Sequence, residues 1–324
     1  MSNILLCGAT GFVGSAIYRS FLNHGLQPKL LLRKPPSKRD TTPLTILGDI
    51  TNPKSLTGCC EGVDVLVHAA SVVSDDEAIC QAINTNGTQY LLAEAQRAGV
   101  SRIIYISTAA VYGNGTHSNI HEGELQPAPV SATSRSRYQA ELSVIEHGGI
   151  VLRPFLIYGI GDRWFIPALV KLLRTFPVMI EKGDARLSLL SADDLAECVA
   201  LLTLAPKKSF SQNIYHVSPE KSVKVREVIY MLHQHGLIPL PSRDLTFTQA
   251  LDSFRSSGDF LERQLSLIAF DHIYDARALK NVIGILPRNF NDRFDDYIEP
   301  YSEELGRPYI KNLKDNLKYP YISK

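Results

Sequence analysis

The sequence lacks the features that mark membrane proteins, metal-binding modules and nucleic-acid-binding proteins. No apolar run reaches the roughly 18 residues that a membrane-spanning helix needs. Lys and Arg total 34 against 33 Asp and Glu, so the formal net charge of +1 gives no bulk attraction for nucleic acid or an anionic membrane. The cysteines show no CxxC or Cys/His spacing, so neither a metal site nor a disulfide framework is indicated. They stand at Cys7, Cys59, Cys60, Cys80 and Cys198.

The overall composition is that of an ordinary globular protein. The 324 residues include 44% hydrophobic and 21% charged side chains, which excludes wholesale disorder and allows a substantial core. A strand pattern begins at once without the composition of a signal peptide, so we expect a soluble, cytoplasmic protein.

Short apolar runs alternate with segments of helical periodicity in the first half of the chain. Continuous apolar strands separated by helices indicate a parallel sheet covered on both faces, so the predicted fold class is α/β and doubly wound. The predicted strands are 4–7, 29–32, 44–47, 63–68, 102–107 and 150–152, and the predicted helices are 14–23, 78–97 and 131–147.

The alternation weakens beyond about residue 160. We still predict helices at 164–175 and 193–204 and a strand at 187–190, but 218–324 are richer in Pro, Tyr and isolated charges. We therefore assign 1–160 to the sheet domain, with 187–216 returning to it. The remainder of 161–324 is expected to form a smaller lobe that closes over the C-terminal edge of the sheet.

A glycine-rich turn joins the first predicted strand to the first predicted helix. Glycines let the backbone turn sharply and approach a pyrophosphate, whose charge the helix N-terminus favours. Because a strand precedes the turn and a helix follows it, dinucleotide binding is a better interpretation than a tight turn without a ligand. The predicted contacts are Gly8, Thr10, Gly11, Phe12, Val13 and Gly14.

The GxxGxxG spacing and a series of later motifs resemble the extended short-chain dehydrogenase/reductases, the NAD(P)-dependent epimerase/dehydratase-like group. These motifs cover most of the chain and are specific in combination. They are Gly48-Asp49, His68-Ala69-Ala70, Asn84-Thr85-Asn86-Gly87-Thr88, Ser107-Thr108-Ala109-Ala110-Val111-Tyr112-Gly113, Leu152-Arg153-Pro154, Tyr158-Gly159 and Asp193-Asp194-Leu195.

The resemblance implies a Rossmann-like dinucleotide-binding domain and a smaller substrate-binding lobe. It implies an adenine contact from Asp49, for which a simple turn or cap is the alternative. The full set of implied cofactor contacts outside the glycine turn is Asp49, Ile50, Ala69, Ala70, Ser107, Arg137, Pro154 and Leu156.

The end of the second predicted strand bears on the choice of cofactor. A carboxylate there would hold the ribose 2′-hydroxyl of NAD, but the strand ends in Leu32-Arg33-Lys34. Arg33 can pair with a 2′-phosphate through two hydrogen bonds, and Lys34 adds a second positive charge. The sequence therefore favours NADP over NAD, with two solvated surface charges as the alternative, and NADP in turn favours a reductase.

The catalytic positions depart from the family pattern. The resemblance implies a Ser or Thr, a Tyr that transfers a proton, and a Lys four residues after it that lowers the Tyr pKa. Thr108 matches the first position, whereas Thr133 stands at the Tyr and Arg137 at the Lys. Arg137 can still bind the ribose, but the aliphatic hydroxyl of Thr133 is too weak an acid to replace a phenol.

The substrate side is implied by the same resemblance. Ala109-Ala110 replace the Asp-Glu pair of the dehydratase branch, so sugar dehydration is disfavoured. Tyr112 has packing as its alternative role, and Trp164 is more often a core residue than a ligand contact. The implied substrate contacts are Ser71, Thr108, Tyr112, Trp164 and Arg186.

These observations favour an atypical NADP-dependent oxidoreductase or epimerase-like enzyme that acts on a small hydroxylated or carbonyl metabolite. A non-redox enzyme on the same scaffold (cyclisation, elimination or isomerisation) and a non-catalytic dinucleotide-binding regulatory subunit stay open as alternatives. Helices 78–97 and 131–147 match those that form a dimer interface in the family, so a homodimer is implied. No nucleic-acid or membrane partner is expected.

Overall fold

A seven-stranded parallel sheet organises the N-terminal two thirds of the protein. The computed structural model describes residues 3–35, 44–254 and 259–306. All pairings in the sheet are parallel, and the strand order is β12-β7-β5-β4-β1-β2-β3. The strands are β1 (Ile4–Cys7), β2 (Lys29–Leu32), β3 (Thr45–Leu47), β4 (Val65–His68), β5 (Arg102–Ile106), β7 (Ile150–Pro154) and β12 (Ile214–Val217). The order reverses direction at β1, as in a Rossmann fold, so the doubly wound parallel sheet predicted from the sequence is confirmed.

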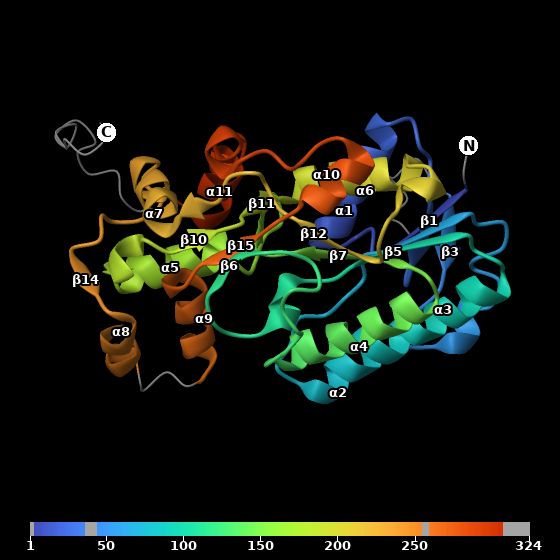
Figure 1. Ribbon diagram of the computed structural model, residues 1–324, viewed down its shortest axis with the longest axis horizontal. Coiled ribbons are helices and arrows are strands. Elements are labelled where there is room, and N and C mark those ends of the chain that lie inside the picture. Colours follow the sequence, from blue (N-terminus) through green and yellow to red (C-terminus); the bar gives the residue numbers. More distant parts are fainter. Residues whose placement is uncertain (1–2, 36–43, 255–258, 307–324) are drawn as a thin grey trace.

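Helices cover both faces of this sheet, as its uniformly apolar strands require. Figure 1 shows α1 (Phe12–Asn23), α6 (Ala192–Leu204) and α10 (Arg277–Ile283) above the strands. On the opposite face lie α2 (Glu77–Cys80), α3 (Gly87–Arg97) and α4 (Ala132–Glu146). The N-cap of α4 is Ser131, which forms a capping box with Ser134.

The helix predicted over 78–97 is confirmed, but its middle is π-helical. A π-helical turn over Gln81–Asn86 separates α2 from α3. This turn places the side chain of Asn84 in the interior, where it is fully buried and hydrogen-bonded to the loop that follows β4. Such turns inside helices are frequent at functional sites.

The chain crosses between the sheet and the smaller lobe more than once. The segment predicted as one strand over 187–190 is divided between β10 (Arg186–Leu187) and β11 (Leu190–Ser191), which pair in different sheets. Residues beyond β11 return to the main sheet as α6 and β12. Helix α10 also returns, because Leu279 packs in the core shared by α1, α6 and the sheet.

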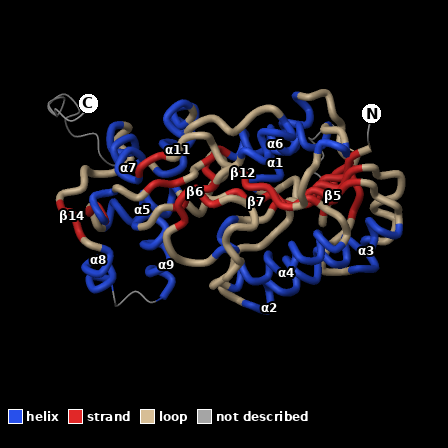
Figure 2. Tube along the Cα trace, in the orientation of Figure 1, coloured by secondary structure: helices blue, strands red, loops and turns tan. Residues whose placement is uncertain are grey.

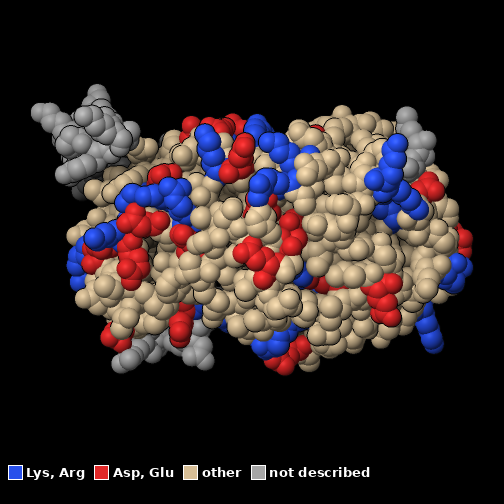
Figure 3. Space-filling view, viewed as in Figure 1, with Lys and Arg blue, Asp and Glu red and all other residues tan. Residues whose placement is uncertain are grey.

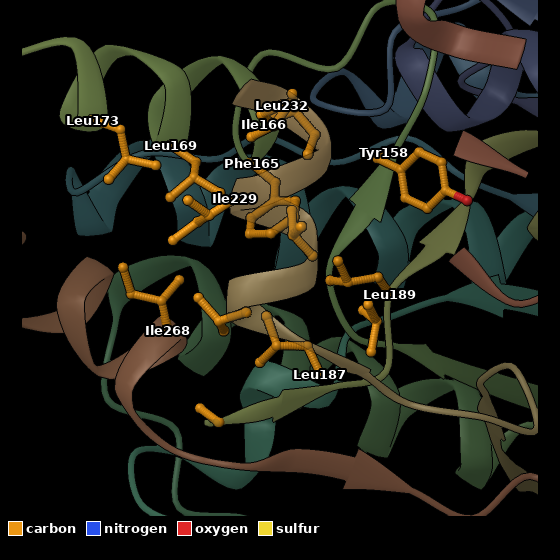
Figure 4. Close-up of a cluster of buried hydrophobic side chains, with 14 of the residues drawn as sticks. Tyr158, Phe165, Ile166, Leu169, Leu173, Leu187, Leu189, Ile229, Leu232 and Ile268 are labelled. Atoms are coloured by element: carbon orange, nitrogen blue, oxygen red, sulfur yellow. The ribbon is translucent and has the colours of Figure 1, made fainter. Parts of the chain in front are cut away.

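The smaller lobe is built around its own apolar core. Figure 2 shows its short strands and helices at the end of the molecule away from β5. Side chains from α5, α7, α9 and β10 interdigitate in this core, as Figure 4 shows for Leu169, Leu187, Ile229 and Ile268. The lobe contains α5 (Ile166–Thr175), α7 (Val225–Gln234), α8 (Phe247–Phe254), α9 (Asp259–Ala269), α11 (Ile298–Leu305), β6 (His117–Ile120), β8 (Ile157–Tyr158), β9 (Val178–Ile180), β13 (Val223–Lys224), β14 (Arg243–Leu245) and β15 (His272–Tyr274).

Charges of both signs are mixed over the face of the molecule in Figure 3, where neither sign covers a large area. Among the residues that the structure describes, no helix is long and apolar enough to cross a membrane. The same residues contain no group of three His, Cys, Asp or Glu side chains that could hold a metal ion.

Candidate functional site

The glycine turn after β1 is packed so closely that side chains are sterically excluded from it. Gly8 has a φ of +92°, and a Cβ on it would lie 2.5 Å from the backbone nitrogen of Ala70. A Cβ on Gly14 would lie 1.9 Å from the carbonyl oxygen of Gly8. The turn is therefore held against both the start of α1 and the loop after β4.

The N-terminus of α1 is open to an anion. Its N-cap is Gly11, which has no side chain to accept from the first-turn N–H groups. The Gly11 N–H itself donates to the Gly8 carbonyl at 3.0 Å and closes the turn. Unpaired N–H groups and the helix dipole favour a phosphate at this end. Thr10 and Gly11 are exposed, whereas Phe12 and Val13 are partly buried, so the turn fits the pyrophosphate of a dinucleotide.

The residues predicted to contact the adenosine part of a cofactor follow β2 and β3. Arg33 and Lys34 are exposed directly after β2. Asp49 accepts hydrogen bonds from the N–H and the hydroxyl of Thr51 at 2.9 and 2.8 Å, and these bonds, with the Arg33 charge, lower its pKa. The structure thus shows the turn role that was the alternative for Asp49. Ile50 is buried near Gly87, at the start of α3.

Buried polar atoms without partners gather at the carboxyl ends of β4 and β5. Among the described residues, His68 Nδ1 and Ser107 Oγ have no hydrogen-bond partner, and the buried Tyr105 hydroxyl interacts with the Arg137 guanidinium. Burial lowers the pKa of His68 to about 4, assisted by the Arg137 charge, so the imidazole is neutral at pH 7. Unsatisfied buried polar groups are costly. Their concentration here marks this edge of the sheet as a place for a polar ligand or ordered water.

Arg137 lies against the end of β5. Its Nη2 donates to the carbonyl oxygens of Ile106 and Ser107 at 2.6 and 2.9 Å. Ser107 is buried, and its N–H donates to Leu152 of β7 at 2.8 Å. The guanidinium therefore stands at the predicted nicotinamide side, where its contact with the ribose stays a prediction. Pro154, in β7, is buried, and Leu156 is partly buried beyond it.

Thr108 keeps a hydroxyl proton that can be donated. Thr108 Oγ1 accepts from the N–H of Ala110 at 3.1 Å, at the start of the 3₁₀ turn Ala109–Tyr112. Within the described part of the chain, this hydroxyl has no acceptor of its own. A substrate oxygen can fill that place.

The hydroxyl of Thr133, the residue predicted at the family's Tyr position, is engaged in two hydrogen bonds, and a catalytic role for it stays a prediction. Its hydroxyl donates to the Ser74 carbonyl at 3.0 Å and accepts from the Ser74 N–H at 3.0 Å. The only proton of the hydroxyl is therefore already used. The side chain that stands at the family's Tyr position is a tie between α4 and the loop after β4.

Tyr112 packs in the interior, which agrees with its alternative role, and its contact with a substrate stays a prediction. Its ring is 2% exposed and stacks on Tyr274. Its hydroxyl lies 2.6 Å from His216 Nε2 and accepts from Arg153 at 2.9 Å. Arg153 in turn makes a buried ion pair with Glu141, so Tyr112 closes a network under the cleft.

Trp164 is exposed, which corrects the expectation of a core role. Its side chain is 59% accessible, and nearby Ile160 is 56% accessible. The loop that holds them is fixed, because the Asp162 carboxylate accepts N–H bonds from Trp164, Phe165 and Ile166. The Tyr301 hydroxyl of α11 donates to the same carboxylate at 3.0 Å and accepts from the Gly159 N–H at 2.8 Å.

The other predicted substrate contacts lie at the surface. Ser71 is exposed directly after Ala69 and Ala70, which are partly buried beside the glycine turn. Arg186 is exposed on β10, which pairs with β13 in the small sheet. Their contacts to a substrate stay predictions. The homodimer interface on α3 and α4 also stays a prediction, with Tyr90 and Leu142 exposed on these helices.

Two structural ties of the site were not predicted from the sequence. One joins Thr133 and Asn84 to the loop after β4, and the other joins Asp162 to Tyr301. Asn84 was visible as part of a family motif, but Tyr301 lies far from Asp162 in the chain and gave no local signal.

The strand order, the glycine turn and the buried polar atoms at the carboxyl ends of β4 and β5 are those of a dinucleotide-binding α/β protein. The chain belongs to the NAD dependent epimerase/dehydratase family, whose sequence profile matches residues 4–218. It is similar to a 2-alkyl-3-oxoalkanoate reductase from Stenotrophomonas maltophilia (strain K279a), with 27% identity over 263 residues that cover 76% of this chain and 79% of the relative.

Two further proteins extend the comparison. A 4-hydroxy-2-methyl-3-oxo-4-farnesyl-3,4-dihydroquinoline-1-oxide ketoreductase from Stigmatella aurantiaca is 26% identical over 270 residues, covering 80% of each chain. The solved structure of MoeE5 in complex with UDP-glucuronic acid and NAD matches with a TM-score of 0.72 and 22% identity, covering 94% of this chain and 100% of that one. This likeness shows the fold, and family membership supports a nicotinamide dinucleotide as the cofactor.

Proposed function

We propose that this protein is an NADP-dependent reductase of a ketone, or dehydrogenase of the matching secondary alcohol, whose substrate carries an extended apolar group. The observation that supports the substrate class is the anchored loop with exposed Ile160 and Trp164. Large apolar side chains held at a surface in this way are typical of a binding site for an apolar ligand.

The position of this loop connects it to the cofactor cleft. A Cβ on Gly161 would lie 3.6 Å from the ring of Phe12, at the start of α1. Leu156, two residues after the end of β7, is partly buried and packs against the core of the smaller lobe. An apolar substrate group that leaves the cleft in this direction would cover Ile160 and Trp164. The two curated relatives are named as reductases of oxo compounds with alkyl or farnesyl substituents, which agrees with this proposal.

Residues of this chain would bind the cofactor and polarise the carbonyl group of the substrate. The glycine turn and the N-terminus of α1 would hold the pyrophosphate, and Arg33 and Lys34 would pair with a 2′-phosphate. A nicotinamide bound there supplies the hydride for ketone reduction. Thr108 would donate a hydrogen bond to the substrate oxygen, and the positive charge of Arg137 beside Ser107 would stabilise the alkoxide that hydride addition leaves on the substrate. Solvent water would supply the proton that completes the alcohol.

Steady-state assays with NADPH and NADH test the proposal. The substrates are 3-oxo esters of increasing chain length, with UDP-glucose as the sugar-nucleotide comparison. Each methylene buried against the apolar loop contributes about 0.8 kcal/mol, close to a fourfold gain in kcat/KM. Trp164→Ala should flatten this chain-length dependence, whereas Tyr230→Ala, which changes an aromatic exposed elsewhere, should leave it intact. Turnover of UDP-glucose without ketone reduction would overturn the proposal.

A further inference from the structure

The loop over residues 71–76 is held by side chains rather than by a neighbouring strand. Ser74 is bound at both of its backbone polar groups by the hydroxyl of Thr133. Val72 is bound in the same way by Asn84, whose Oδ1 accepts from the Val72 N–H at 2.8 Å and whose Nδ2 donates to the Val72 carbonyl at 3.0 Å. In each of the two loop residues, Val72 and Ser74, both the backbone N–H and the backbone carbonyl are thus hydrogen-bonded to one side chain, which we call a clamp.

The two clamping side chains are themselves firmly placed. Asn84 is fully buried in the π-helical turn and donates to Ser136 of α4 at 3.0 Å. Thr133 lies in the first turn of α4, behind the capping box of Ser131 and Ser134. The thiol of Cys80 adds a third contact by donating to the Ser74 carbonyl at 3.3 Å. The loop therefore follows the position of α4 and of the π-helical turn.

The clamped loop extends from the glycine turn to α9 of the smaller lobe, and the predicted substrate contact Ser71 is exposed at its start. At its start, Ala69 and Ala70 touch the glycine turn. At its other end, the Asp75 carboxylate pairs with Arg263 of α9 at 3.0 Å. Asp75 and Arg263 also line a cavity of about 550 Å³ together with Ser131 and Arg135 of α4. Figure 1 shows α9 near the start of α4, where this cavity lies.

We propose that Thr133 is a positioning residue, which clamps the 71–76 loop and thereby fixes Ser71, the predicted substrate contact at its start. The position that would transfer a proton in the family pattern serves here to hold this loop. The inference deepens the proposed function and rests on it for its kinetic test. It predicts that the Thr133 hydroxyl contributes to substrate binding and does not set the rate of proton transfer.

Two substitutions separate the clamp from a proton-transfer role. Thr133→Val removes the hydroxyl while keeping the shape of the side chain, and Thr133→Ser keeps the hydroxyl. Loss of two hydrogen bonds should raise KM for the 3-oxo ester about tenfold in Thr133→Val, with kcat changed less than about twofold. Thr133→Ser should restore KM to within about twofold of the parent protein. The pH profile of kcat should be the same in all three proteins.

Hydrogen exchange at the Ser74 amide tests the clamp without turnover. Exchange should be at least about tenfold faster in Thr133→Val than in the parent protein and in Thr133→Ser, because the amide loses its acceptor. Unchanged exchange in Thr133→Val would overturn the clamp, and so would a fall in kcat with unchanged KM. If no ketone is reduced by any of the proteins, the proposed function fails, whereas the Ser74 exchange rates still decide whether Thr133 holds the loop.

Discussion

Replacing Glu141 should expose how much the buried network under the cleft contributes to stability. Glu141 is fully buried and accepts from Arg153 Nε at 3.1 and 3.2 Å, while Arg153 is 3% exposed. Glu141→Gln keeps the shape but leaves the Arg153 charge buried without its counterion. Breaking such a pair costs about 3–5 kcal/mol.

The expected shift in melting temperature follows from the size of the chain. Unfolding entropy is about 2.1 cal/mol/K per residue, so a chain of 324 residues has about 0.7 kcal/mol/K. A loss of about 3–5 kcal/mol then lowers Tm by roughly 4–7 °C. Circular dichroism during heating and urea titration measure the loss independently.

Two control variants test whether the loss of stability comes from the buried, unpaired charge. Glu220→Gln removes an ion pair with Lys280 in which the carboxylate side chain is 72% exposed, so its cost should be only about 0–1 kcal/mol. The double change Glu141→Leu with Arg153→Met should be more stable than Glu141→Gln, because no charge is then left buried alone. If Glu141→Gln is as stable as Glu220→Gln, the reasoning about the buried pair is refuted.

Two further predictions concern the glycine turn and the buried histidines. Gly14→Ala should weaken NADPH binding, followed by nicotinamide fluorescence, at least about tenfold, since its Cβ would overlap the Gly8 carbonyl. Gly25→Ala, where nothing lies within 4 Å, should retain affinity, and equal affinity in both would contradict the assignment. Burial lowers the pKa of His68 and His216 from 6.5 to about 4, so below pH 6.5 the unfolded state binds more protons and stability falls as pH approaches 4. His216→Gln should therefore reduce this pH dependence in urea titrations, by up to about 3 kcal/mol between pH 6.5 and 4, and an unchanged slope would contradict it.

Local patterns sufficed for six of the seven strands of the large sheet, whereas no strand was predicted at 214–217, where β12 lies at the sheet edge. β1 and β2 match their predicted bounds residue for residue, because both are short apolar runs bounded by turn residues. The glycine turn was also predictable, because a turn this closely packed requires glycine, and the glycines are visible in the sequence. The bounds of β3 and β4 moved by one and two residues, since the ends of apolar runs do not define where pairing stops.

Elements that depend on distant partners were harder to predict. The π-helical turn over Gln81–Asn86 interrupts a segment whose apolar spacing looks like one helix. Its interruption is tied to hydrogen bonds between Asn84 and the loop at Val72, which no helical periodicity encodes. The division of 187–190 between β10 and β11 likewise depends on pairing with distant strands. β10 pairs with β13 and β15, whereas β11 pairs with β8.

The amino-acid sequence by itself determined the parallel sheet and the glycine turn after β1, and it led to the prediction that Thr133 and Arg137 stand at the family's Tyr and Lys positions. Only the tertiary structure decided what those two side chains do, because their partners lie far away in the chain. Thr133 meets Ser74, 59 positions earlier, and Arg137 meets the carbonyls of β5. It also decided that Trp164 faces solvent, since Asp162 and Tyr301 fix the loop that presents it. Hydrogen bonds of this kind depend on distances between segments, which residue types and spacing do not specify.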